Sequence, residues 1–386
     1  MDSPLRDIAI QLICILIIFT SVEASEKPKE AKDMEAPAST ETVHGWVIQP
    51  SFKHDVFHFI WSISESNPTE NRWYREEMAQ WRAKLSADML KKLDEVTHWD
   101  TSWISQSLIG SLFSTIKADT IDEIIQALTD DEVMKAAKEK TGKLPPREPY
   151  CTMLVEVLRA VQAEGFEEYW HKEIKPIVQQ QCDTLLDFLK DYPTDRLIDA
   201  INEFVKPDKP FHAPTLYVYL TYFSYSLSYR VSENVQVQSF RPGESINASR
   251  FVRTAIHEFL HNFCPDSTLE GYYQALCKND GFFAATFPKL KVWGEGGWEN
   301  IVEAGEAYVS YKLGLGASEE LAQHLRRQYD GALVLAQVIY HQLLTRETEL
   351  ASLGYNDFLV KLFEEDIIST GNLEAQYQTI SAANAK

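Results

Sequence analysis

Residues 254–263 read Thr-Ala-Ile-His-Glu-Phe-Leu-His-Asn-Phe and contain the pattern HExxH, with His257, Glu258 and His261 at its defined positions. Residues four apart lie one turn above each other on a helix, so both histidines can present ring nitrogens to one metal ion. An apolar stripe with the spacing i, i+3, i+4 and i+7 occupies another face: Ile256, Phe259, Leu260 and Phe263. The segment therefore predicts a helix with one face packed in a core and one face that binds zinc, rather than two ordinary histidines on a solvated face.

A catalytic zinc site needs a third protein ligand and an open position for water. Ser267 stands six residues after His261, where metzincins carry a third histidine, so the sequence excludes that class. Residues 298–308, Trp-Glu-Asn-Ile-Val-Glu-Ala-Gly-Glu-Ala-Tyr, predict a second helix after the glycine-rich run 294–297. One face of this helix carries three stacked carboxylates, which repel one another unless they meet a cation: Glu299, Glu303 and Glu306.

The two motifs together resemble the gluzincin superfamily of zinc metallopeptidases, in which HExxH is followed on a second helix by a glutamate ligand and, four residues later, by an acid. The run from Glu299 to Glu303 is similar to the second zinc motif of the neprilysin family, which usually carries Asp at the position of Glu303. The resemblance covers residues 251–311, and the run from His257 to Pro265 also resembles small uncharacterised exported metallopeptidases.

The resemblance implies a zincin-like catalytic domain that holds one Zn²⁺ per chain through His257, His261 and Glu299. Glu303 would accept a ring N–H from a ligand histidine and fix its tautomer. If Glu303 were the ligand instead, Ala307 would stand in the orienting position, and it cannot orient a ring.

Peptide hydrolysis is the activity that the resemblance implies, with Glu258 as the general base that takes a proton from a zinc-activated water. Downstream residues that could stabilise the oxyanion are Tyr272, Tyr273, Tyr308, His324 and His341, of which His341 and Tyr308 are the preferred candidates. Two alternatives stay open: an exported binding protein with a vestigial zinc site, and a zinc hydrolase that acts on a non-peptide amide or ester. A structural zinc with Cys264 as fourth ligand is disfavoured because Pro265 bends the chain there.

Outward from these motifs, the pattern predicts an α+β fold that is predominantly helical, with a short mixed sheet bordering the active-site helix. Residues 44–205 are expected to form a mainly helical N-terminal region, and residues 206–386 the zincin-like catalytic region. Strands are predicted in residues 215–229 and 235–238, where aromatic and β-branched side chains alternate with polar ones. The first of these strands is a candidate to pair with an extended peptide along its edge.

The start of the chain predicts export. Residues 1–24 contain Arg6, an apolar run from Ile8 to Phe19 and the small-residue ending Val-Glu-Ala, which is typical of a cleaved signal peptide. Residues 25–43 are rich in Glu, Lys, Ala and Pro and predict a disordered leader. The mature protein is therefore expected to be secreted, without stable insertion in a membrane.

Secretion would place the four cysteines of the mature chain in an oxidising compartment. The expected disulfides are Cys151–Cys182 and Cys264–Cys277, with four buried thiols as the alternative. Asn247-Ala248-Ser249 matches the acceptor pattern for N-glycosylation, although Asn247 is equally suited to cap the helix that carries His257.

The composition is that of a folded protein, because 45% of the 386 residues are hydrophobic and 12% are aromatic. Lys and Arg number 37 against 57 Asp and Glu, so the formal net charge is −20. Such a charge argues against nucleic acids and anionic membranes as partners, and it favours a basic or neutral peptide or protein substrate. The oligomeric state is left open.

Overall fold

The computed structural model describes residues 42–66, 73–98, 118–135, 150–223, 228–232, 234–263, 267–292 and 298–383. All of them belong to one unit of mutually contacting residues, Glu41–Lys386. The predicted signal peptide, nearly all of the predicted leader and Cys264 lie outside the described residues. None of the helices within the described ranges is long and apolar enough to cross a membrane.

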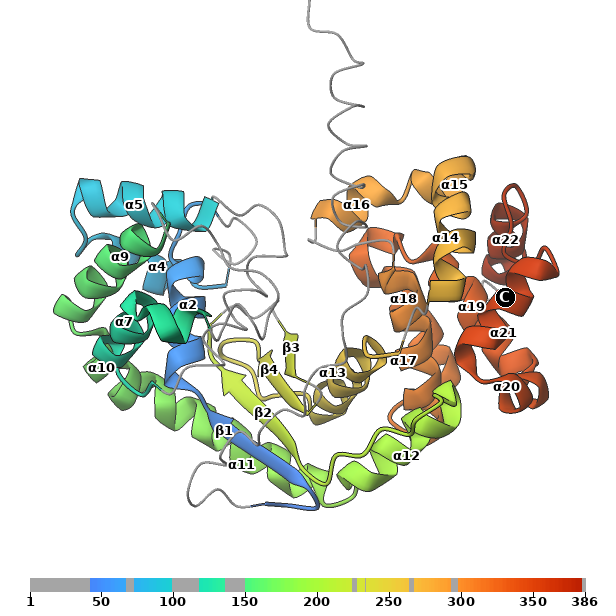
Figure 1. The fold of residues 1–386 in the computed structure, drawn as a ribbon, viewed down its shortest axis with the longest axis horizontal. Coiled ribbons are helices and arrows are strands. Elements are labelled where there is room, and N and C mark those ends of the chain that lie inside the picture. Colours follow the sequence, from blue (N-terminus) through green and yellow to red (C-terminus); the bar gives the residue numbers. More distant parts are fainter. Residues whose placement is uncertain are drawn as a thin grey trace, which may run out of the picture. The chain divides into compact units, whose positions relative to one another are not determined.

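A four-stranded mixed sheet lies at the centre of the fold, in the order β1-β2-β4-β3 (Figure 1). Its strands are β1 (Trp46–Pro50), β2 (Leu216–Thr221), β3 (Tyr229–Ser232) and β4 (Val235–Ser239). β1 and β4 both run parallel to β2, in registers that pair Trp46 with Leu216 and Tyr217 with Val235. β3 is antiparallel to β4 and forms an edge of the sheet.

Helices surround the sheet, and those before β2 form the first group in the chain. Their bounds are α2 (Phe52–Ser62), α4 (Arg75–Arg82), α5 (Ala87–His98), α7 (Ile121–Thr129), α9 (Thr152–Ala163), α10 (Phe166–Tyr169), the π-helix η2 (Trp170–Ile174), α11 (Lys175–Leu189) and α12 (Thr194–Val205). α9 packs on α5 and α7, whereas α11 packs on β1.

The second group of helices follows β4. It consists of α13 (Ala248–Leu260), α14 (Ser267–Asn279), α15 (Gly281–Ala284), α16 (Phe287–Val292), α17 (Glu299–Leu313), α18 (Ser318–Arg327), the 3₁₀ helix η3 (Gln328–Gly331), α19 (Val334–Thr345), α20 (Glu347–Leu353), α21 (Tyr355–Glu364) and α22 (Leu373–Ala383). α17 packs on α13 and α19, and is buried along nearly its whole length. The predicted fold class is thus confirmed as predominantly helical α+β with a small mixed sheet.

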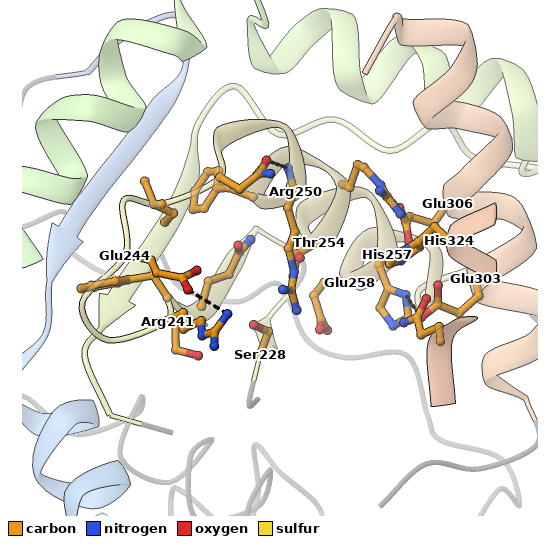
Figure 2. Close-up of a pocket in the computed structure, with 18 of the residues that line it drawn as sticks. Ser228, Arg241, Glu244, Arg250, Thr254, His257, Glu258, Glu303, Glu306 and His324 are labelled. Carbon is orange, nitrogen blue, oxygen red and sulfur yellow. Dashed lines mark hydrogen bonds and ion pairs between the residues drawn. The ribbon is translucent and has the colours of Figure 1, made fainter. Parts of the chain in front are cut away.

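The helix that carries HExxH is α13, and its sequence explains its position. Asn247 caps it by accepting a hydrogen bond from the backbone N–H of Arg250 at 2.9 Å. The predicted apolar stripe is buried at Ile256, Phe259 and Leu260, while Phe263 is half-buried. α13 contacts β3, β4, α11, α12 and α17, and six of its residues line the pocket in Figure 2: Arg250, Phe251, Arg253, Thr254, His257 and Glu258.

The strand predicted at residues 215–229 is shorter than expected. β2 ends at Thr221 because the next two backbone N–H groups, those of Tyr222 and Phe223, donate to the buried carboxylate of Asp55 on α2, at 2.7 and 3.1 Å. The indole N–H of Trp170 donates to the same carboxylate at 2.9 Å. These side-chain contacts replace the hydrogen bonds of a sheet and tie α2 to the end of β2.

β1 was not predicted as a strand, and it changes how the regions are connected. It comes from the predicted N-terminal region, yet it pairs with β2 of the predicted catalytic region. The boundary at residues 205 and 206 stays a prediction, but the sheet that supports α13 requires both regions. The strand predicted to pair with a peptide contains β2, but β2 lies between β1 and β4 and has no free edge. The edge strand that contacts α13 is β3.

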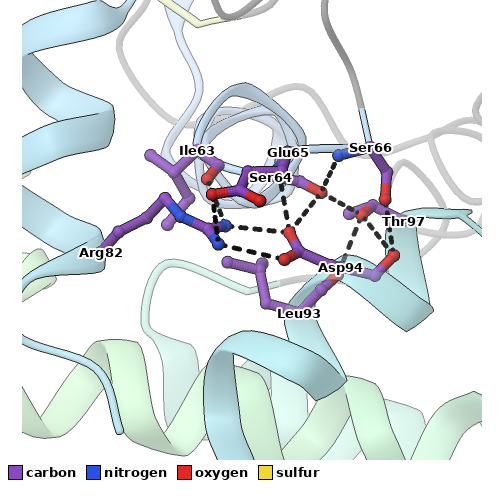
Figure 3. Close-up of polar contacts among 8 residues, drawn as sticks. All are labelled: Ile63, Ser64, Glu65, Ser66, Arg82, Leu93, Asp94 and Thr97. Carbon is purple, nitrogen blue, oxygen red and sulfur yellow. Dashed lines mark hydrogen bonds and ion pairs between the residues drawn. The ribbon is translucent and has the colours of Figure 1, made fainter. Parts of the chain in front are cut away.

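A polar network joins α4 and α5 to the end of α2 (Figure 3). Arg82 donates to both carboxylate oxygens of Asp94, at 2.9 and 3.0 Å. The hydroxyl of Ser64 and the backbone N–H of Glu65 donate to the same carboxylate at 3.0 and 2.9 Å. Partial burial raises the pKa of Asp94, whereas the hydrogen bonds from these donors lower it. The second effect is larger, so the pKa lies below its ordinary value of 3.8.

We expect Asp94→Ala to lower the free energy of unfolding by about 1–3 kcal/mol at pH 7, because it removes an acceptor shared by four hydrogen bonds, although Arg82 keeps its contacts with Ile63 and Glu65. A carboxyl whose pKa is depressed by folding stabilises above its unfolded pKa, and this contribution is lost as pH falls through the folded pKa. The difference in free energy of unfolding between wild type and Asp94→Ala should therefore be constant from pH 7 to 5 and shrink below pH 4. Urea unfolding across this range measures this difference in free energy, with Asp199→Ala at an exposed position as control; a difference independent of pH would contradict the assignment.

Candidate metal centre

The two histidines of HExxH lie together at the end of α13. His257 is in the last turn of the helix and His261 is the residue that caps it. Their Nε2 atoms are 3.0 Å apart. Burial lowers the pKa of His261 to about 4, so its ring is neutral at pH 7, the form in which histidine binds metals.

α17 brings Glu299 to both histidines. Its Oε2 lies 3.3 Å from Nε2 of His257, and its Oε1 lies 3.7 Å from Nε2 of His261. Ligand atoms at about 2.0–2.1 Å from a tetrahedral zinc would be separated by about 3.3 Å. The structure thus brings one ligand atom from each of His257, His261 and Glu299 within 4.8 Å of the others, close enough for the three to share one metal ion.

Gly305 on α17 packs closely against α13 and α12. A Cβ at this position would lie 3.1 Å from a methyl of Leu260 on α13 and 3.2 Å from the ring of Phe204 on α12. These distances are tighter than ordinary van der Waals contacts, so an added methyl group would require the neighbouring side chains to shift by a few tenths of an ångström. Gly305 lies between Glu303 and Glu306 in α17, so this close packing occurs in the turn that carries both carboxylates.

The electrostatics of the site favour a positive charge. Burial lowers the pKa of His257, but the neighbouring carboxylates of Glu299, Glu303 and Glu258 raise it well above the ordinary value. Burial raises the pKa of Glu299, and the two imidazoles bring it below its ordinary value. Within the described residues, the buried Oε2 of Glu303 accepts no hydrogen bond, and the buried Oε2 of Glu299 faces Nε2 of His257 at 3.3 Å without the geometry of a good hydrogen bond. Such atoms are costly unless a cation or donor faces them, and the ligand set of two imidazoles and a carboxylate suits zinc.

Glu303 lies on the other side of the His257 ring. Its Oε1 is 3.8 Å from Nδ1 of His257, close to the position expected of an acid that orients a ligand histidine. The same oxygen accepts hydrogen bonds from Gln328 at 2.7 Å and from the hydroxyl of Tyr329 at 3.4 Å. Burial and the neighbouring charge of Glu306 raise the pKa of Glu303 to about 8.

A second group of ligand atoms, His257, Glu303 and Glu306, is also close enough to share an ion. Glu306 has a different partner, however, because Arg253 on α13 donates to it at 2.7 Å, and both side chains are largely buried. Burial raises the pKa of Glu306, and Arg253 brings it below its ordinary value. The arginine already supplies the positive charge at this position, so the Glu299 set is the better metal centre.

Glu258 faces the pocket beside the histidines. Its side chain is buried, which raises its pKa, and the backbone N–H of Arg230 on β3 donates a hydrogen bond to it. The pocket has a volume of about 400 Å³ and extends from His257 and Glu258 along α13. A carboxylate of raised pKa at the wall of a pocket is suited to accept and return a proton.

The two preferred oxyanion candidates are not brought to this pocket. Tyr308 donates to Glu347 at 3.3 Å and lines a separate pocket beside α20. His341 is exposed on α19 and does not line the pocket that contains His257 and Glu258. Both predictions relied on order along the chain, which does not specify which face of a helix meets the site.

Three other side chains line this pocket instead: His324, Gln328 and Tyr329. They come from the end of α18 and from η3, and only His324 was among the wider set of candidates. Tyr329 and Asp330 have φ of +48° and +54°, a left-handed backbone that is unusual for such residues. No local sequence motif marks this turn, so the sequence offered no signal for Gln328 or Tyr329.

The predicted disulfide between Cys151 and Cys182 is not formed, and both residues are thiols. Cys151 precedes α9 and Cys182 lies in α11, and these helices pack on different neighbours. Cys277 is also a thiol, and its predicted partner Cys264 lies outside the described residues. The capping role of Asn247 is confirmed, while its glycosylation stays a prediction.

No family model, curated protein or solved structure matches the chain.

The buried pair Arg253–Glu306 should be tested by single and double substitution. Arg253→Met leaves Glu306 buried without its partner, and we expect the free energy of unfolding to fall by about 3–5 kcal/mol. The double variant Arg253→Met with Glu306→Gln should be clearly more stable than the single one, because no uncompensated charge remains. Urea unfolding at pH 7 measures the free energy of unfolding of both variants. Equal losses in the two would show that Arg253 does not compensate the buried charge of Glu306.

Proposed function

We propose that this chain is an exported zinc hydrolase that cleaves peptide bonds. The observation that carries the proposal is the spacing of 3.0–3.7 Å among the ligand atoms of His257, His261 and Glu299, beside a pocket that Glu258 lines. This combination of ligands, spacing and an adjacent carboxylate supports a catalytic zinc site. Export is part of the same proposal and depends on residues 1–24.

Zinc bound by His257, His261 and Glu299 would supply Lewis-acid activation of a water molecule and of a substrate carbonyl. Glu258 would accept the proton of the attacking water and return it to the leaving nitrogen, for which its raised pKa is suited. Glu303 would hold the ring of His257 through Nδ1.

The position of β3 supports a peptide as the substrate. This strand is at the sheet edge beside α13, and its Arg230 contacts Glu258 through the backbone. An extended peptide that pairs with such an edge would bring a backbone carbonyl close to Glu258. A non-peptide amide or ester would not use the edge, so a preference for peptides of several residues favours the proposal.

The zinc content of purified wild type and of ligand variants tests which residues bind the metal. We expect purified wild type to hold one zinc per chain and Glu299→Ala to lose it on dialysis, because two imidazoles remain as the only ligands. Glu303→Ala should keep zinc but bind it about 10–100-fold more weakly, because His257 loses its orienting acid. Glu347→Ala, at the separate pocket, is the matched control. A wild type without zinc affinity would rule out the proposal.

Glu258→Gln separates metal binding from catalysis. The substitution keeps the size of the side chain and should leave zinc content unchanged, while hydrolysis of a mixed peptide library should fall by about 10²–10⁴-fold. Mass spectrometry of the digested library gives the rate and the cut positions. Zinc binding without hydrolysis by the wild type would favour a binding protein or another substrate class.

A further inference from the structure

The turn that joins α18 to α19 has a backbone that its residues rarely adopt. Tyr329 has φ of +48° and ψ of +43°, and Asp330 has φ of +54° and ψ of +34°, so both are left-handed residues that carry a Cβ. The turn is held on both sides, because Leu325 before it and Leu333 after it are fully buried. Lys289 on α16 also donates to the carbonyl of Asp330 at 3.0 Å. Strain of this kind persists only where the surroundings enforce it, and it is common at functional sites.

Two consecutive side chains of this turn reach the same atom. Gln328 donates to Oε1 of Glu303 at 2.7 Å, and the hydroxyl of Tyr329 donates to the same oxygen at 3.4 Å. Neighbouring residues point about 100° apart on a regular helix and to opposite faces on a strand, so neither element would direct both donors to one oxygen. The unusual backbone therefore has a consequence at the metal centre, where both side chains line the pocket.

Glu303 is restrained by the turn more strongly than by the histidine that it faces. Oε1 of Glu303 is 3.8 Å from Nδ1 of His257, which is longer than a hydrogen bond. Figure 2 shows the two side chains beside each other at the wall of the pocket. The hydrogen bond from Gln328 to the same oxygen is much shorter. The turn thus presents Glu303 to the ring of His257 before a metal is bound.

We propose that Gln328 and Tyr329 are positioning residues for the metal centre, which hold Glu303 in place to orient the imidazole of His257 toward zinc. An acid that orients a ligand histidine raises metal affinity. An acid whose own position is already fixed loses less conformational freedom when it does so. This role rests on the proposed zinc centre, yet it concerns metal affinity whatever the substrate is.

Zinc affinity, measured by competition with a chromogenic chelator, tests the two donors. Gln328→Met keeps the length of the side chain and removes the donor, so we expect zinc to bind about 3–10-fold more weakly, a smaller loss than removal of the acid itself would cause. Tyr329→Phe removes a longer contact and should weaken binding by only about twofold. Gln323→Met on α18 and Tyr311→Phe on α17, both at exposed positions, are the matched controls.

A double substitution shows whether Gln328 acts through Glu303. In the Glu303→Ala background, Gln328→Met should change zinc affinity by less than about twofold, because its acceptor is already absent. The visible absorption of bound cobalt(II) reports the geometry of the ligands, so Gln328→Met should alter this spectrum and Gln323→Met should not. A purely structural role would lower stability and leave the spectrum of the loaded protein unchanged.

Two substitutions of Asp330 test the shape of the backbone. Both remove the same exposed carboxylate, but Asn adopts the left-handed conformation readily, whereas the β-branched Val does so very rarely. We expect Asp330→Asn to keep the zinc affinity of the wild type. Asp330→Val should lower it about as much as Gln328→Met, because the turn can no longer direct both donors to Glu303.

Wild-type zinc affinity in Gln328→Met, or an equal loss of affinity with and without Glu303, would overturn the positioning role and leave the proposed zinc hydrolase intact. Zinc affinity that depends on Gln328 in a protein that cleaves no peptide would support the role and contradict the peptidase function. A wild type without zinc affinity would contradict both.

Discussion

The contact between α13 and α17 is the constraint on which the rest of the site depends, because each helix turns charged side chains toward the other inside the protein. Buried charges are tolerated only when they are compensated. Arg253 and Glu306 compensate each other, whereas His257, His261 and Glu299 form a group that could hold a metal ion. Gly305 on α17 leaves room for the side chain of Leu260 on α13, which would lie 3.1 Å from a Cβ at that position.

The sheet fixes the direction in which α13 presents these residues. Gln236 on β4 donates to the carbonyl of Ala255, and the backbone of Arg230 on β3 donates to Glu258. β1 completes this sheet from the beginning of the described chain, and α2 is tied to the end of β2 through Asp55. The supports of the metal centre therefore come from both halves of the chain, although every candidate ligand lies in the second half.

Features with a local cause could be predicted from the sequence. The stripe that buries Ile256 and Phe259 and the cap at Asn247 depend on neighbours within one or two turns, so periodicity and spacing were sufficient. Features with distant causes were missed or misplaced. β1 needs β2 as a partner, the end of β2 depends on Asp55, and the predicted pair Cys151–Cys182 belongs to helices that pack on different neighbours.

The sequence alone determined that His257 and His261 share one face of a helix and that Glu299, Glu303 and Glu306 share one face of another, because helical spacing fixes these relations within about three turns. Only the tertiary structure decided that Glu299 is the glutamate that meets both histidines. It also decided that Arg253 neutralises Glu306, and that the turn after α18 lines the pocket instead of Tyr308 or His341. The physical reason is that spacing assigns a residue to a face of its own helix, whereas the choice of which faces meet is made by packing between segments distant in the chain.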